Sequence, residues 1–244
     1  NLTGGTLGVG TSITTTTVAP DGTTNIYLYY DRNEYTLTLE KNEYIETVTG
    51  AGTYKWGATV AINATVKTNI TGYNASVWDK WTLTEGNGVT VPTTIKGNIV
   101  MTAGNITIVA NAVKGTPITY SVVYNGNGAT GGTTASSTYT YDKAQNLTLN
   151  GYVRQYTVTF NGNYEGSTSQ TAKSTYAFKD WNLKNDGTGN AYTNGQSVTN
   201  LTSTNNGTVT LYAMWDNTVS SAKLTLPTLT RANYVFEGWY KEQA

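Results

Sequence analysis

The stretch Tyr35-Thr36-Leu37-Thr38-Leu39 alternates two kinds of side chain along its length, and it decides the fold class of this chain. Successive side chains of a strand point to opposite faces of its sheet, so this alternation is typical of a half-buried strand. Residues 120–124 and 156–160 repeat the pattern. We therefore predict three opening strands, at 35–39, 120–124 and 156–160.

A second recurring pattern is an aromatic doublet with three-residue spacing that ends in Trp. Residues three apart lie on opposite faces of a regular strand, so a doublet shares one face only if a bulge or bend intervenes. We interpret Trp181 and its equivalents as the large apolar plug of a small core. The predicted core residues are Trp81, Phe178, Trp181, Trp215, Phe236 and Trp239.

A third pattern is a closing strand, at 25–30, 105–110 and 208–215, and the three patterns recur in the same order. The predicted divisions follow from that order. Residues 1–33 are the end of one unit, 34–114 a full unit, 116–217 a longer unit with two opening strands, and 218–244 the start of another. A chain that begins and ends inside a repeat is expected to be part of a longer array.

The order of these patterns resembles the internalin-type B repeats, also called Listeria–Bacteroides repeats, of Gram-positive surface proteins. The resemblance is best over 156–216 and 226–240, where Leu226-Pro227-Thr228 leads to the Trp239-Tyr240 pair. Residues 34–112 resemble a divergent bacterial repeat of the same kind. The resemblance implies β-grasp-like modules in tandem on a secreted or cell-wall-attached protein. It carries no catalytic residues. Asn233 stands where the family usually has Gly, which predicts a left-handed turn there.

The composition agrees with a mostly β chain (α+β at most), built of small β-grasp-like or β-sandwich-like modules in an elongated array. Thr, Asn, Tyr and Gly abound, which favours strands and tight turns over helices. The 15 basic and 15 acidic residues balance, so the sequence shows no sign of binding nucleic acid or an anionic membrane. No apolar run is long enough for a membrane-spanning helix.

His and Cys are both absent, which excludes catalytic triads, Cys-His pairs and His- or thiolate-based metal sites. We therefore expect no enzyme, no catalytic residue, no metal and no cofactor. Asp79, Asp180 and Glu237 recur beside the doublets, which favours a structural role over a catalytic one. The amide-rich loop 182–190 has too few carboxylates for a good calcium site. A Lys–Asn isopeptide cross-link would need Lys41 or Lys55 to meet Asn105 or Asn111 in a core.

Exposed aromatic side chains are a possible contact surface for sugar or protein. Tyr-rich strands place some rings on the wet face, and the candidate contact residues are Tyr27, Tyr29, Tyr139 and Tyr141. Cross-strand pairing that stabilises the sheet is the alternative explanation for these rings.

The sequence thus predicts an extracellular structural or adhesive repeat region that acts as a semi-rigid spacer. Its expected partners are neighbouring repeats of the same chain. Three alternatives stay open: a carbohydrate-binding module, a host-protein-binding module, and a filament subunit that pairs sheet edges with copies of itself. Linkers as short as Asp31-Arg32-Asn33 and Lys114-Gly115-Thr116-Pro117 predict modules in single file with fixed orientations.

Overall fold

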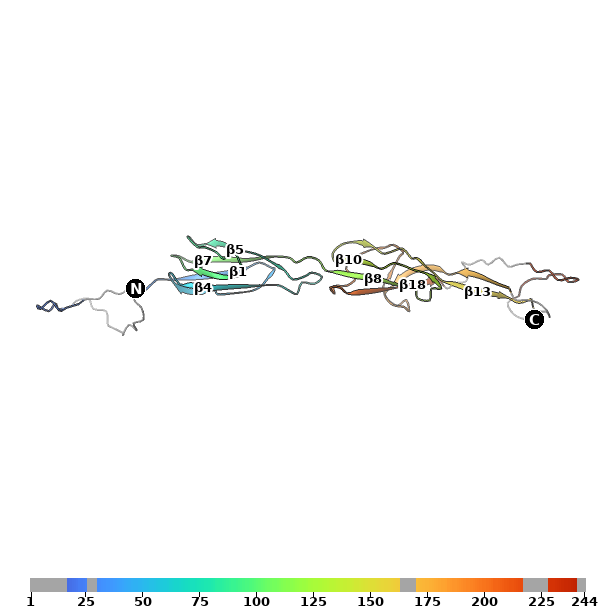
Figure 1. Ribbon diagram of the computed structural model, residues 1–244, viewed down its shortest axis with the longest axis horizontal. Coiled ribbons are helices and arrows are strands. Elements are labelled where there is room, and N and C mark those ends of the chain that lie inside the picture. The colour runs from blue at the N-terminus through green and yellow to red at the C-terminus, as the bar shows by residue number, and fades with distance from the viewer. Residues whose placement is uncertain (1–16, 26–29, 163–169, 217–227, 241–244) are drawn as a thin grey trace.

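The computed structural model describes residues 17–25, 30–162, 170–216 and 228–240. Every regular element in these ranges is a β-strand, which confirms the mostly-β prediction and leaves no helical part among the described residues. The strands form several small sheets, gathered in two units that follow one another along the long axis of an elongated molecule (Figure 1). No helix in the described part of the chain has the length and apolar character needed to cross a bilayer.

The first unit, residues 34–113, is a sandwich of two sheets. A four-stranded sheet has the order β3-β1-β7-β5, and a three-stranded sheet has the order β2-β4-β6. The strands are β1 (Glu34–Lys41), β2 (Ile45–Thr49), β3 (Gly52–Lys55), β4 (Thr59–Val66), β5 (Val77–Glu85), β6 (Lys96–Val100) and β7 (Ile106–Val113).

The core of the first unit lies between its two sheets. Leu37, Ile106 and Ile108 come from the larger sheet, and Ile62 and Ile99 come from the smaller one. All five are almost fully buried. Each strand contributes alternate residues, as β7 shows with buried and half-buried positions in strict succession.

The second unit, residues 118–216, has one five-stranded sheet of order β10-β8-β18-β15-β16 and much smaller accessory sheets, β11–β17 and β12–β9. The strands are β8 (Thr119–Asn125), β9 (Gly131–Gly132), β10 (Ser137–Thr140), β11 (Gln145–Asn146), β12 (Tyr152–Val153), β15 (Ala177–Asn182), β16 (Ala191–Tyr192), β17 (Ser197–Val198) and β18 (Thr208–Asp216). Its core is separate from the first and is dominated by aromatic rings.

The large sheets of the two units share a strand order. In each, the opening strand (β1 or β8) pairs antiparallel with the edge strand that follows it, β3 or β10. The same opening strand pairs parallel with the closing strand, β7 or β18. The closing strand then pairs antiparallel with the aromatic strand, β5 or β15. A parallel pair needs a long crossover between its strands, and here the intervening strands supply it.

A β-bulge sits at the same place in both aromatic strands. The register shifts between Trp78 and Lys80 in β5 and between Phe178 and Asp180 in β15. One extra residue turns the next side chain to the opposite face, which brings both members of each doublet to one side of the sheet. The two doublet rings are 5.4 Å apart in β5 and 5.0 Å apart in β15.

The three predicted opening strands all exist, as parts of β1, β8 and β13. The third differs from the others, because among the described strands β13 (Gln155–Phe160) pairs with β14 (Gln170–Thr175) alone and joins no larger sheet. This two-stranded arm projects beyond the second unit toward residues 228–240 (Figure 1). Asn233 has a φ of 67°, so the left-handed turn predicted for it is confirmed.

Candidate joint between the two units

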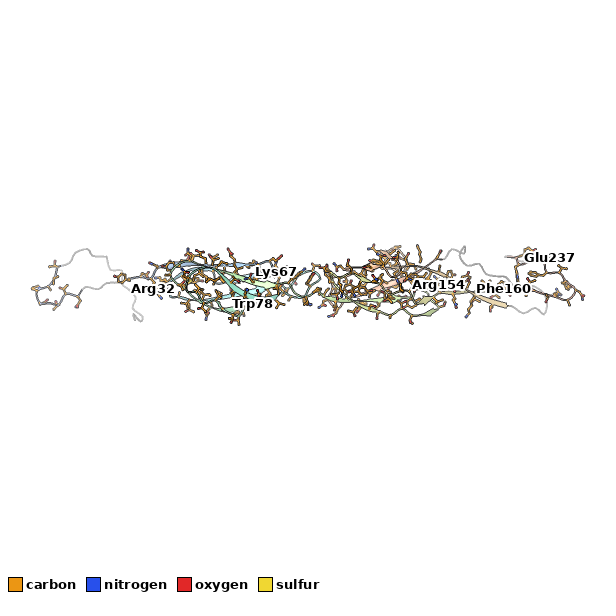
Figure 2. The ribbon with its side chains drawn as sticks, turned by 90° about the horizontal axis from the view of Figure 1, so that it is seen from above. Arg32, Lys67, Trp78, Arg154, Phe160 and Glu237 are labelled. Atoms are coloured by element: carbon orange, nitrogen blue, oxygen red, sulfur yellow. The ribbon has the colours of Figure 1, made fainter. Side chains whose placement is uncertain are left out.

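The loop between β4 and β5, residues 67–76, forms one side of a joint with the second unit. Tyr73 makes an isolated antiparallel bridge with Pro117, which lies in the connection between the units. The amide of Ile118 donates to the carbonyl of Gly72 at 3.0 Å. Lys67, where the loop begins, lies toward the end of the first unit that faces the second (Figure 2). The connection is therefore hydrogen-bonded to the first unit.

Asn74 adds side-chain contacts to this backbone pairing. Its amide donates to the carbonyl of Thr116 at 2.9 Å, and its Nδ2 donates to the Thr116 hydroxyl, also at 2.9 Å. Asn205 of the second unit donates to the Asn74 Oδ1 at 3.3 Å. Gly115 passes so close that a Cβ there would stand 2.1 Å from the Asn74 carbonyl oxygen. Only glycine allows the two chain segments to approach this closely.

The side chain of Tyr73 reaches across the joint. Its hydroxyl donates to the Oδ2 of Asp142, which lies just beyond β10 in the second unit. Its ring meets the ring of Tyr141 edge to face, with centroids 5.9 Å apart. The Nζ of Lys114 lies 3.4 Å from the centre of the Tyr73 ring, in the position of a cation–π contact. One tyrosine thus contacts the second unit through both its hydroxyl and its ring.

Asp142 is held in place by a second partner, Asn200. The Asn200 side chain donates to Asp142 Oδ1 at 2.7 Å and accepts from the Asp142 amide at 2.6 Å. Both residues have positive φ, 55° and 53°, which Asp and Asn tolerate better than most residues. The hydrogen bonds from Tyr73 and Asn200, and then the charge of Lys114, hold the pKa of Asp142 below its ordinary value.

The same contacts shift the pKa of Lys114 in the opposite direction. Its contact with the Tyr73 hydroxyl, aided by the charge of Asp142, raises the pKa of Lys114 above its ordinary value of 10.5. Both charged groups are open to solvent, so water and salt screen their attraction. The joint therefore depends chiefly on its hydrogen bonds and ring contacts, and the two charges orient them.

Gly72 is a second position in the joint that requires glycine. Its φ is 76°, a conformation that L side chains rarely adopt. A Cβ on Gly72 would also lie 2.2 Å from a ring carbon of Tyr141. The ring of the second unit therefore packs directly on the backbone of the first.

The structure places the predicted core residues as follows. Trp81 and Trp181 are buried in the first and second cores, with Trp181 fully enclosed, and Trp215 is buried while Phe178 packs half-buried beside it. Phe236 is 39% exposed, and Trp239 is half-buried. The prediction of a core position therefore does not fit Phe236, because its segment, 228–240, forms no extended sheet that would cover the ring.

Of the candidate contact aromatics, the two that the structure describes, Tyr139 and Tyr141, do not form an exposed platform. Tyr139 is only 1% exposed, so the interpretation of this residue as a surface contact is corrected: it stacks on Tyr120 inside the second core. Burial raises the pKa of its hydroxyl, and the neighbouring Tyr124 hydroxyl adds to the effect. Tyr141 is half-buried because it packs against Tyr73 in the joint. Tyr27 and Tyr29 lie outside the described residues.

The loop 182–190 is organised by its own amides. Asn182 is buried, and its side chain donates to the carbonyls of Gly187 and Gly189 and accepts from the amides of Lys184 and Gly189. Asp186 accepts from the amide and hydroxyl of Thr188. Within the described residues no three acidic side chains gather as metal ligands would.

The lysines considered for an isopeptide cross-link have other partners. Lys41 donates to the carbonyl of Glu46, and Lys55 binds the carboxylate of Asp31 at 2.6 Å. Asn105 meanwhile accepts from the amide of Thr36. Of the recurrent acids, Asp79 is exposed in the bulge of β5, whereas Asp180 is half-buried and lies 4.0 Å from the Nζ of Lys179.

Sequence reasoning identified the short connection Lys114-Gly115-Thr116-Pro117 but did not identify its partners. Tyr73, Asp142 and Asn200 were missed because no sequence pattern links residues 69 or 58 positions apart. The available signal was local. A Gly-Tyr-Asn triplet at 72–74 places an aromatic residue in a polar loop, outside any predicted strand.

Comparisons with known proteins identify no relative of this chain. No family model matches the chain, and no curated protein or solved structure matches it significantly.

Proposed function

We propose that this chain is a structural spacer of an extracellular surface protein, in which small β units of one kind are joined in a stiff row. The observation that carries the proposal is the joint around Tyr73. Its contacts tie the connecting segment to the first unit and the first unit to the second, which supports a restricted swing between the two cores. A row of units in fixed orientations keeps its length and transmits force, and a stalk needs both properties.

The shared strand order supports the idea that the two units are copies of one repeat. The parallel pairing of opening and closing strands and the bulge in the aromatic strand are the same in both. Two unrelated sheets would not be expected to share the strand order, the parallel pairing and the bulge. The resemblance to internalin-type B repeats then supplies the setting, a secreted or cell-wall-attached bacterial protein with adhesive or projecting parts.

Trp56 supports a head-to-tail arrangement of such units. It follows β3 as Tyr141 follows β10, and the amides of both donate to the residue before the opening strand, Asn33 or Ile118, at 2.8 and 3.0 Å. Tyr141 is the ring that receives Tyr73 of the preceding unit. Trp56, at the other end of the first unit, is 53% exposed and presents an aromatic ring at the corresponding position.

Small-angle scattering on the intact chain tests the spacer. A compact globule of this length would have a radius of gyration of about 18 Å, and we expect a distinctly larger value with the profile of a rod. Replacing Tyr73 with Ala should broaden the distribution of distances between the units while leaving their two melting transitions in place. A compact wild-type chain, or a Tyr73→Ala chain as stiff as wild type, would contradict the proposal.

A further inference from the structure

The two-stranded arm β13–β14 does not obtain its stability from a sheet. Among the described strands, β13 and β14 pair only with each other. A lone two-stranded hairpin is marginally stable in water, because its cross-strand pairs barely offset the loss of chain entropy. Contacts beyond the hairpin must therefore hold the arm in position.

The base of the arm is fixed to the second unit. The amide of Tyr176 donates to the carbonyl of Arg154 at 2.8 Å, and the Arg154 guanidinium lies 4.8 Å from the centre of the Tyr176 ring. Tyr156 packs on the same ring with a centroid distance of 4.8 Å. The amide of Gln155 donates to the hydroxyl of Thr130 at 2.9 Å. These contacts position the arm but leave its far end without support from the second core.

The far end of the arm is fixed by Phe160. This ring is only 7% exposed, yet it belongs to neither hydrophobic core. It packs against Trp239, with ring centroids 5.0 Å apart, and Trp239 packs on Phe236 at 5.8 Å. Figure 2 shows Arg154 at the base of the arm and Phe160 farther out, toward Glu237. The ring at the end of the arm thus faces the aromatic doublet of residues 228–240.

The arm occupies the same place in its unit as the loop that bears Tyr73. Loop 67–76 comes directly before the aromatic strand β5, and the arm comes directly before the aromatic strand β15. Loop 67–76 reaches forward to the second unit, and the arm reaches forward to residues 228–240 (Figure 1). In both units, the segment before the aromatic strand contacts the part of the chain that comes after the unit.

We infer that the β13–β14 arm is a docking element whose partner is the aromatic doublet Phe236/Trp239, and that it forms a second joint along the chain. Phe160 inserts beside Trp239 and holds the doublet next to the second unit. The second unit thereby supplies part of the apolar surface on which the following aromatic segment packs. The mechanical meaning of this joint rests on the spacer function proposed above, whereas the docking itself does not.

The experiment replaces Phe160 with Ala in the full 244-residue chain. Two readouts report on residues 228–240: the NMR signal of the Trp239 indole N–H, and the rate of tryptic cleavage after Arg231. We expect the indole signal to move toward its position in an unfolded chain and cleavage to speed up about tenfold, because an aromatic pair and its buried area are lost together. Trp239→Ala should accelerate the same cleavage, and the double variant should add little beyond either change.

Thr159→Ala is the matched control, since Thr159 directly precedes Phe160 in β13 and is exposed. It should leave both readouts at wild-type values. An unchanged Trp239 signal and cleavage rate in Phe160→Ala would overturn the inference. So would loss of the Trp181 indole signal in that variant, because the arm would then be part of the second core. Neither result bears on the Tyr73 joint, whose test is the distance between the units.

Discussion

At the scale of single residues, each core contains a buried tryptophan. The two tryptophans differ in whether the indole N–H has a hydrogen-bond partner. The indole N–H of Trp81 donates to the carbonyl of Thr94 at 3.1 Å. Trp181 is more deeply buried, with the rings of Tyr124, Phe178 and Tyr152 around it, and none of the described residues forms a hydrogen bond with its Nε1. Its position is therefore fixed by packing alone.

Trp181→Ala tests that packing. Removing a fully buried aromatic ring costs about 3–5 kcal/mol, which is a large share of the stability of a small unit. We expect the second unit to lose its cooperative melting transition while the first unit keeps its own. Trp56→Ala is the matched control, because its ring is half exposed and its loss should change stability by about 0.5 kcal/mol or less. Calorimetry of the three chains makes the measurement.

Gly72→Ala tests the contact between backbone and ring in the joint. The new methyl group would meet Tyr141 and would also force an L side chain into a positive φ. Gly88→Ala separates the two effects, since Gly88 has a φ of 68° but nothing within 4 Å of its Cβ position. We expect both variants to lower the stability of the first unit, and only Gly72→Ala to loosen the units in small-angle scattering. Equal scattering from both would show that the Tyr141 contact is dispensable.

At the scale of elements, the bulge in each aromatic strand decides which face its tryptophan covers. Lys179 is the extra residue of β15, lying between Phe178 and Asp180 where the register shifts. Its own side chain is exposed. The exposed Lys179 therefore determines which face of the sheet the buried Trp181 occupies.

Deleting Lys179 tests this geometry. A one-residue change of register flips every side chain beyond it, so Trp181 would leave the core for the opposite face, where Asp180 now lies, and Asn182 would take its place in the core. We predict that the second unit unfolds while the first does not. Lys179→Ala keeps the residue count and should behave like wild type. Fluorescence emission reports the outcome, because Trp181 shifts to longer wavelength when water reaches it. A folded deletion variant would show that the bulge can relocate.

At the scale of the whole molecule, the joint connects two separate cores, and its charges predict how it responds to pH. The lowered pKa of Asp142 means that the ionised form is favoured in the folded joint, so this contribution is present above its ordinary value of 3.8. It is lost as the pH falls through the lowered pKa. The raised pKa of Lys114 gives a contribution present below 10.5 and lost as the pH rises through the raised pKa.

We therefore expect the distance between the units to be constant between these limits and to become variable in acid. Spin labels on the two units, measured by electron paramagnetic resonance over a pH series, follow this distance directly. Asp142→Asn keeps a hydrogen-bond acceptor for Tyr73 but cannot ionise, so its distance distribution should lose the acid response that Asp142 produces. Tryptophan fluorescence in the same samples shows whether the units themselves stay folded. An acid response that persists unchanged in Asp142→Asn would assign it to other groups.

The sequence by itself determined the strand positions at 35–39, 120–124 and 156–160 and the mostly-β class, which follow from local rules: side-chain alternation and β-branched residues. The turn at Asn233 was predicted from the family resemblance together with the tolerance of Asn for positive φ. Only the tertiary structure decided that 156–160 belongs to a separate arm, that Tyr139 is buried and that Tyr73 reaches Asp142. Those facts depend on which segments meet after folding. The alternation of a strand shows that one face is buried, but it does not show against what.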